Sequence, residues 1–382
     1  MEIHYTINTF MRILARLFRV LLKTLRGLAE FLQKVVGWAL LSISYFAGIG
    51  ITAIVARMCG KNFLGQKSAK NIKPIGKIYP RRNCLRRNII DNFDMNNVVQ
   101  RFYNASPFPD YELDRFETTE DLELAAKTFS KILDRSIPQE ASIIDVGTGT
   151  GQLSAFLSLR RENVLGVDFS DSSLNKARSL KEKLALKSLT LKKVDVLNEE
   201  QVENIGEKFD CLLCLGVLHH TDDPYEGFRN VTKLVKPGGY VAIGLYNKCG
   251  RTLLKIRRLL AKTIFRNNER AKEYFIRLQL GDEQDAETIR GWWNDQYEHP
   301  QETAHTVGEV LDWFEKNDIE YWGANPSLLF FDKSDPTISG AWNSADKRYP
   351  GPLARFCKQL KWMWTTHRDG GYWVMFGKKR NE

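Results

Sequence analysis

The sequence has few cysteines, and their spacing excludes most cysteine chemistry. Six cysteines in 382 residues fit a protein of a reducing compartment. Only Cys211 and Cys214 share a Cys-x-x-Cys spacing, and they stand inside the apolar run CLLCLGV, which is typical of a buried strand. No other group of residues has the spacing of zinc ligands, so we predict no metal site. A chain of this length buries enough apolar surface to fold without disulfides or a structural metal.

Acidic residues are scarce in the first quarter of the chain. Residues 1–90 contain 16 Lys and Arg but only two acids, Glu2 and Glu30, which gives a net charge of +14. Because the whole chain carries +10, the other 292 residues carry −4. Such an asymmetry indicates that the N-terminal quarter meets a membrane surface or nucleic acid.

Residues 1–34 have the pattern of a basic amphipathic helix. Cationic residues recur three or four apart and so share one helix face: Arg12, Arg16, Arg19, Lys23 and Arg26. Leu and Phe occupy the other side, the pattern of a helix that lies in a membrane interface. A helix packed on the protein's own core is the alternative, which the shortage of acids disfavours.

Residues 35–56 contain no charged residue, and a helix of this length spans ~30 Å, the thickness of the hydrocarbon core. The segment is therefore predicted to be a transmembrane or a monotopic apolar helix. Ten Lys and Arg lie in residues 57–87, against six in residues 1–34, within a basic linker predicted over residues 57–96. The larger number of Lys and Arg after the apolar segment predicts a membrane-associated protein whose remaining chain lies on the cytoplasmic side. A monotopic insertion, with both basic flanks on that side, satisfies these charges equally well.

Between residues 120 and 247, short apolar runs alternate with patterns of helical period. This alternation predicts an α/β fold, a parallel sheet with helices on both faces, whose ligand lies at the carboxyl ends of the strands. The first strand leads into the stretch IIDVGTGTGQLS, where glycines allow close approach of the backbone to a ligand. Alone, Gly-x-Gly-x-Gly is weak evidence and could equally open a nicotinamide site.

The following strands add acidic residues in a set order. Asp168 ends the second strand, where a carboxylate can accept hydrogen bonds from both hydroxyls of a ribose. Asp195 ends the third strand, where it can meet an adenine amino group. Two histidines, His219 and His220, end the fourth strand.

In this order the stretches DVGTGTG, GVDFS, VDV, LGVLHHTDDP and LVKPGG resemble the class I S-adenosylmethionine-dependent methyltransferase family over residues 142–247. The resemblance implies a Rossmann-like sheet of seven strands in the order 3-2-1-4-5-7-6, with residues 97–382 as the domain and residues 248–305 and 326–369 as insertions. It also implies S-adenosylmethionine as the cofactor, held by Asp145, Gly147, Gly149, Gly151, Asp168, Phe169, Asp195, Val196, Leu215 and Gly216.

Two groups of residues are candidates for contact with the methyl acceptor. His219 or His220 could take a proton from a nucleophilic oxygen or nitrogen. The insertion segment WWNDQYEHPQETAHT, which includes Tyr297 and His299, could line an acceptor pocket, or it could be an ordinary lid with its tryptophans in the core. Upstream, Tyr103 and Phe108 could cover the cofactor, unless their segment is a plain surface turn.

The sequence thus favours a membrane-associated methyltransferase that modifies an O or N of a small-molecule or lipid-linked acceptor. An RNA methyltransferase with a basic N-terminal arm is one alternative, but residues 57–90 lack the interleaved aromatics of most nucleic-acid grooves. A binding module without catalysis is another, which the aspartates and the histidine pair disfavour.

Overall fold

A computed structural model of the chain describes residues 95–109, 111–263, 268–281, 286–328, 349–366 and 370–381. The chain divides into two compact units, Met1–Cys84 and Leu85–Glu382. The amphipathic helix, the apolar helix and all but the end of the basic linker predicted over residues 1–96 lie outside the described residues and stay predictions. In the described part of the chain, no helix is both long and apolar enough to cross a bilayer.

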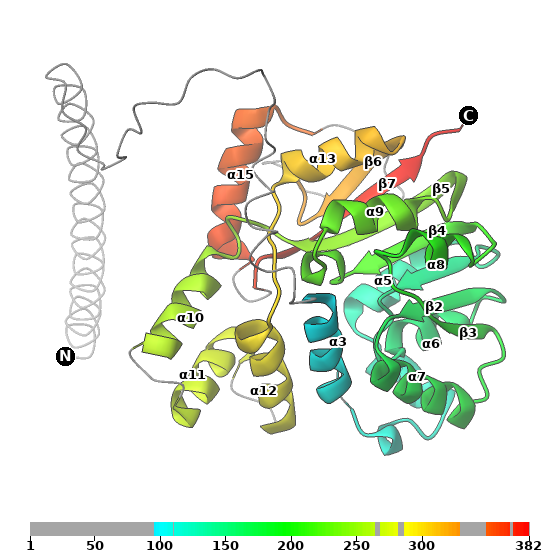
Figure 1. Ribbon diagram of the computed structural model, residues 1–382, viewed down its shortest axis with the longest axis horizontal. Helices are drawn as coiled ribbons and strands as arrows, with labels where there is room; N and C mark the ends of the chain where they lie inside the picture. Colours follow the sequence, from blue (N-terminus) through cyan, green and yellow to red (C-terminus); the bar gives the residue numbers. More distant parts are fainter. Residues whose placement is uncertain are drawn as a thin grey trace, which may run out of the picture. The chain divides into compact units, whose positions relative to one another are not determined.

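Seven strands form one sheet in the order β3-β2-β1-β4-β5-β7-β6, which confirms the predicted order (Figure 1). Strands β1 to β5 pair in parallel, and β7 is antiparallel to both β5 and β6. The strands are β1 Ile143–Val146, β2 Val164–Asp168, β3 Leu189–Lys193, β4 Phe209–Leu215, β5 Val235–Tyr246, β6 Ile319–Asn325 and β7 Tyr372–Lys379.

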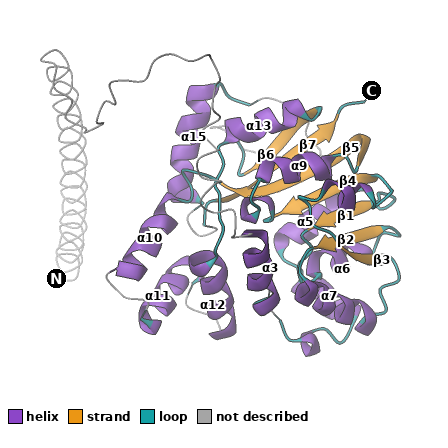
Figure 2. Cartoon of the chain, in the orientation of Figure 1, coloured by secondary structure: helices purple, strands orange, loops and turns teal. Residues whose placement is uncertain are grey.

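Helices cover both faces of this sheet, as Figure 2 shows. Those of the sheet domain are α3 Met95–Ala105, α4 Thr119–Ala125, α5 Thr128–Ser136, α6 Gln152–Ser158, α7 Asp171–Lys183, α8 Glu199–Glu203, α9 Pro224–Thr232 and α13 Val307–Lys316. The predicted insertions contain α10 Thr252–Thr263, α11 Glu269–Leu280, α12 Ala286–Trp293, the π-helix η3 Asn294–Glu298 and α15 Pro352–Thr365. Short 3₁₀ turns, η1 Leu113–Arg115 and η2 Leu218–His220, complete the described elements.

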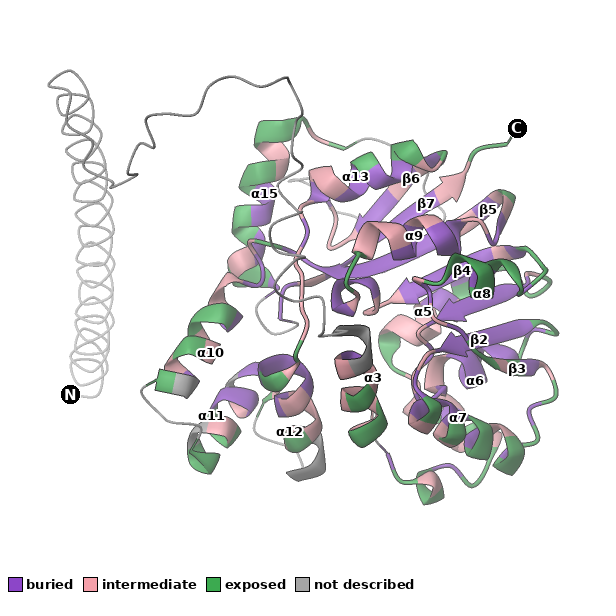
Figure 3. Cartoon of the chain, viewed as in Figure 1, coloured by how far each residue is buried: buried purple, intermediate pink, exposed green. Residues whose placement is uncertain are grey.

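The core lies on both sides of the sheet, whose inner strands β1, β2 and β4 are almost wholly buried, whereas the edge strand β3 is largely exposed (Figure 3). Ile144 and Leu212 face a cluster that includes α8, α9, α13 and α15, whereas Ile143 and Leu213 face a cluster that includes α4 to α7. Successive side chains of a strand point to opposite faces, so each strand contributes to both clusters.

Two helical regions are interrupted, and one strand is shorter than expected. Residues 119–136 form two helices, α4 and α5, because Ala126 takes an extended conformation between them. Helices α10 and α11 are likewise separate, and the Asn268 side chain caps α11 by accepting from the Arg270 N–H. The third strand ends at Lys193, so Asp195, expected at its end, lies in the following loop.

The segment from α10 to η3 has a small hydrophobic core of its own. Leu254, Phe275, Ile276 and Trp293 are its most buried large members, with Tyr297. This cluster lets the insertion hold a fixed shape beside the sheet, which an extended loop of that length would not do.

Candidate active site

A cavity of about 660 Å³ opens at the carboxyl ends of the parallel strands, a volume usual for small-molecule sites. The loops that follow β1, β2, β3 and β4 form one side of it. Helices α4 to α6, strand β7 and the insertion residues Trp292, Asp295 and Gln296 form much of the rest, together with residues of α3, β5 and β6. The cavity therefore lies where the strand alternation predicts a ligand.

The glycine loop between β1 and α6 has the conformation that only glycine adopts easily. Gly147, Gly149 and Gly151 have φ of 69°, 56° and 82°. A Cβ on Gly149 would stand 2.6 Å from the Phe108 carbonyl oxygen, and Gly147 and Gly149 both line the cavity. Gly151 does not: it caps α6, and a Cβ there would meet Ala177 of α7 at 2.7 Å. Gly151 therefore allows α6 to pack closely on α7, and its contact with the cofactor stays a prediction.

Asp168 joins the glycine loop to the end of β2. Its Oδ2 accepts the Gly149 N–H at 2.9 Å, and its Oδ1 accepts the Ser170 N–H at 2.8 Å. Burial raises the pKa of Asp168, and the carboxylate lines the cavity. Each oxygen keeps a further lone pair, so the residue can accept the two hydroxyls of a ribose as well.

Asp145 lies beneath this loop. It accepts a hydrogen bond from Ser154, which in turn contacts the Thr148 hydroxyl. Burial raises the pKa of Asp145 to about 6. This network holds the floor of the cavity in place.

The other residues that the resemblance implied for the cofactor all line the cavity: Phe169, Asp195, Val196, Leu215 and Gly216. Tyr103 and Phe108 line it too, which agrees with their expected position over the cofactor. The loop glycines, the free lone pairs of Asp168 and the flat apolar side chain of Phe169 fit the groups of S-adenosylmethionine.

Of the histidines, His220 reaches the cavity. Its Nδ1 is 2.9 Å from the Gln301 carbonyl oxygen, which can only accept, so the proton lies on Nδ1 and Nε2 is left as an acceptor. Burial lowers the pKa of His220 to about 4, so the ring is neutral at neutral pH and can take a proton. His219 and His299 do not line the cavity; their rings pack against the His220 ring at 4.2 and 3.8 Å.

Tyr297 lies away from the cavity, contrary to the expectation that it lines the acceptor pocket. Its ring stacks on Trp293 at 4.1 Å within the core of the insertion. The π-helix presents the two preceding residues, Asp295 and Gln296, to the cavity instead. The sequence does not indicate a π-helix at this position, so it could not show which residues face the cavity. For this reason Asp295 and Gln296 were not among the predicted site residues.

Asp295 and Gln296 belong to a buried polar wall with Tyr246 of β5. The Gln296 Nε2 donates to the Tyr246 hydroxyl at 2.7 Å and to Asp295 Oδ2 at 2.6 Å. The guanidinium of Arg251 lies 3.5 Å from the centre of the Tyr246 ring and donates to Gln296 Oε1 at 2.6 Å. Glu302 forms a buried ion pair with the same guanidinium. This ion pair therefore holds Arg251 in the position from which it supports Gln296 and Tyr246.

Replacing Glu302 by alanine should destabilise the protein by about 3 kcal/mol, because it leaves the fully buried Arg251 without its counter-ion. Burial alone would raise the pKa of Glu302, but the neighbouring charges of Arg251 and Arg258 lower this pKa to about 2. The carboxylate therefore stays ionised beside the two guanidinium groups. Urea unfolding measures the change. Glu315→Ala, which removes an exposed pair with Arg380, is the matched control and should cost less than about 1 kcal/mol. Equal losses for the two variants would contradict the proposed role of Glu302.

The histidine cluster should make stability fall on acidification. Burial lowers the pKa of His219, His220 and His299, the last to about 3, below the ordinary value of 6.5. Between about pH 6.5 and pH 4 the unfolded chain therefore binds more protons, and the unfolding free energy decreases by up to ~1.4 kcal/mol per pH unit for each histidine. Asp145 has the opposite effect on stability, because its raised pKa lets the folded chain bind a proton at a higher pH than the unfolded chain does.

The contribution of one histidine is isolated by comparing the wild type with His299→Gln. The variant should lose less stability than the wild type between pH 6.5 and pH 4, as measured by urea unfolding at several pH values. Parallel pH profiles for the two proteins would show that His299 does not resist protonation in the folded state.

Comparisons with known proteins agree with this site. A family model described as a methyltransferase domain matches residues 137–305. The ubiquinone biosynthesis O-methyltransferases of Dechloromonas aromatica and Acinetobacter baylyi are 36% and 30% identical to the chain over 115 and 112 residues. Each match covers 29% of the chain and 47% or 46% of the relative, so the chain spans about half the length of these curated relatives.

Among solved structures, PKMT2 from Rickettsia typhi is similar with a TM-score of 0.47 and 16% identity, over 66% of this chain and 54% of that chain. The order of the motifs in the sequence, the order of the strands in the sheet, the residues that line the cavity and the family model all support one assignment. This chain contains a class I S-adenosylmethionine-dependent methyltransferase domain.

Proposed function

We propose that the protein transfers a methyl group to an oxygen or nitrogen of a small apolar or lipid-linked acceptor, at a membrane. One observation carries this proposal: the cavity that includes the cofactor residues also has an extensive apolar lining. It is formed by side chains of α4, α5, α6 and β7, namely Leu122, Ala125, Phe129, Leu153, Phe156 and Val374. An apolar acceptor would be removed from water along this lining, at ~25 cal/mol per Å² of its apolar surface.

The polar side of the cavity supplies the chemistry. When bound, S-adenosylmethionine provides an activated methyl group. The acceptor hydroxyl or amine meets a wall of hydrogen-bonding groups, Tyr246, Asp295 and Gln296, which fix its orientation. The Nε2 of His220 would accept the proton that the acceptor loses when it is methylated.

Two further points support the proposal. The relatives named ubiquinone biosynthesis O-methyltransferases act, by that name, on an oxygen. The basic and apolar pattern of residues 1–56 predicts a membrane attachment, which would bring the enzyme to an acceptor at a lipid surface.

The test is a search for the acceptor with methyl-labelled S-adenosylmethionine. The full chain in detergent is incubated with the organic-soluble and the aqueous fraction of a bacterial cell extract, with Asp168→Ala as the inactive control. The proposal expects label in the organic-soluble fraction with the wild type alone. Label in RNA of the aqueous fraction would favour the RNA methyltransferase. Cofactor binding without labelling of either fraction would favour the binding module.

A further inference from the structure

Helix α15 carries exposed apolar side chains along the face opposite to the one that packs on the sheet. Leu353, Phe356, Leu360 and Trp364 recur at steps of three and four and are 40 to 76% exposed. The opposite face is buried and holds the helix to the sheet, with Trp362 against Trp373 of β7 at 5.6 Å between ring centroids. The exposed apolar stripe, Leu353, Phe356, Leu360 and Trp364, is therefore distinct from the buried face by which α15 packs on the sheet.

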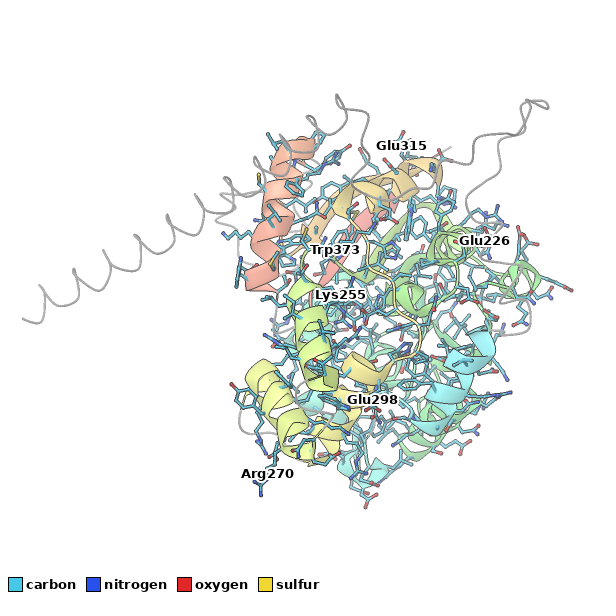
Figure 4. All side chains as sticks on the ribbon, turned by 60° about the vertical axis from the view of Figure 1, so that its left-hand side comes forward. Glu226, Lys255, Arg270, Glu298, Glu315 and Trp373 are labelled. Carbon is cyan, nitrogen blue, oxygen red and sulfur yellow. The ribbon has the colours of Figure 1, made fainter. Side chains whose placement is uncertain are left out.

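Helix α10 continues this surface. Its Ile256 and Leu259 are 49 and 62% exposed. The chain just before α10 lies close to the end of α15, since a Cβ on Gly250 would stand 2.8 Å from Oγ1 of Thr366, the residue after α15. Figures 1 and 4 both show α10 extending beyond the end of α15 along the same side of the domain. We call the exposed residues of the two helices, Leu353, Phe356, Leu360, Trp364, Ile256 and Leu259, the α10/α15 face.

The charges on this face are of one sign. Neither α10 nor α15 contains an acidic residue, although residues 91–382 as a whole carry −4. Lys255 and Lys361 are exposed, and neither forms an ion pair with any residue that the structure describes. Figure 4 shows Lys255 on α10 near the junction with α15.

We propose that the α10/α15 face binds the surface of an anionic lipid bilayer. Leu, Phe, Ile and Trp side chains beside exposed lysines, on helices without acids, are what a helix in the interface of such a bilayer requires. A protein partner is the poorer match, because lysine is depleted in protein–protein interfaces. This second contact is separate from residues 1–56 and does not depend on the identity of the acceptor.

The face is fixed to the acceptor side of the cavity. The Asn247 side chain, next to Tyr246, donates to Gln359 of α15 at 2.9 Å. Arg251, just before α10, stacks on Tyr246 itself. Docking of both helices would thus hold the polar wall of the cavity at a constant position relative to the lipid, where an apolar acceptor is dissolved.

Cys357 provides a probe, because it is exposed on α15 within the stripe. The full chain is prepared with Cys59, Cys84 and Cys249 changed to serine, and an environment-sensitive fluorophore is attached to Cys357. Cys211 and Cys214 are buried and stay unlabelled. The matched control has Cys357→Ser and carries the fluorophore on Lys187→Cys, an exposed position before β3 at the opposite edge of the sheet.

Vesicles of phosphatidylcholine with phosphatidylglycerol should shift the Cys357 probe to the blue and protect it from iodide, and should leave the Lys187→Cys probe unchanged. Phosphatidylcholine alone should give a smaller shift. Adding Leu353→Ser, Phe356→Ser and Leu360→Ser should abolish the blue shift, even if residues 1–56 still bring the chain down with the vesicles.

Two results would overturn the proposal. One is a Cys357 probe that stays exposed to iodide while the chain sediments with the anionic vesicles. The other is a probe already protected without vesicles, which would show that another segment of this chain or a second copy covers the face.

Discussion

The Asp168→Ala variant should bind S-adenosylmethionine at least a hundredfold more weakly than the wild type, a loss of about 3 kcal/mol. The substitution removes the carboxylate that is expected to accept the ribose hydroxyls, and a hydrogen bond to a charged group contributes about 1.5 to 3 kcal/mol. It also removes the acceptor for the Gly149 N–H, which fixes the glycine loop. Calorimetric titration of both proteins with the cofactor measures the change.

Asp171→Ala is the control for this measurement. Asp171 lies three residues later at the start of α7, is exposed, and pairs with Lys193 at 2.6 Å. Its loss should change the affinity for the cofactor less than about threefold, since exposed pairs contribute little. Equal affinities for Asp168→Ala and the wild type, with both proteins folded, would remove Asp168 from the cofactor site.

The second large effect concerns the proton acceptor. His220→Asn should lower kcat for the labelled acceptor about 10² to 10⁴-fold, the usual contribution of a positioned base. Asparagine can still donate to the Gln301 carbonyl but has no basic nitrogen in place of Nε2. Cofactor affinity should stay near that of the wild type, which calorimetry checks.

His219→Asn is the matched control because His219 is adjacent and buried but does not line the cavity. Its kcat should fall much less. In the wild type, the pKa of His220 near 4 keeps the base neutral, so kcat should not fall until the pH approaches that value. A larger loss for His219→Asn than for His220→Asn would assign the base to His219 instead.

The sheet and the cofactor loops could be predicted from the sequence because they depend on local spacing. The apolar strands, the glycines and the two aspartates each follow at fixed distances along the chain, and a parallel α/β sheet brings those loops to one edge. Gly151 shows the limit of this reasoning. Its conformation fits the glycine motif, but whether its backbone faces the ligand or a neighbouring helix is decided by α7 packing against it.

The acceptor side could be predicted only in part, because it is built from tertiary contacts across the insertions. Tyr297 and Asp295 differ by two positions, and the π-helix directs one into a hydrophobic core and the other into the cavity. No helix period of 3.6 predicts that division. The buried pair of Arg251 and Glu302, 51 residues apart, carries no signal in the sequence either.

The structure of the full chain bound to S-adenosylhomocysteine, the demethylated cofactor, tests the central assignment most directly. We predict density along Gly147 and Gly149, with both ribose hydroxyls on Asp168, the adenine between Phe169 and Val196, and the sulfur facing His220. Density for the nucleoside elsewhere, or an unchanged cavity at a saturating concentration of ligand, would contradict the assignment of this cavity as the cofactor site.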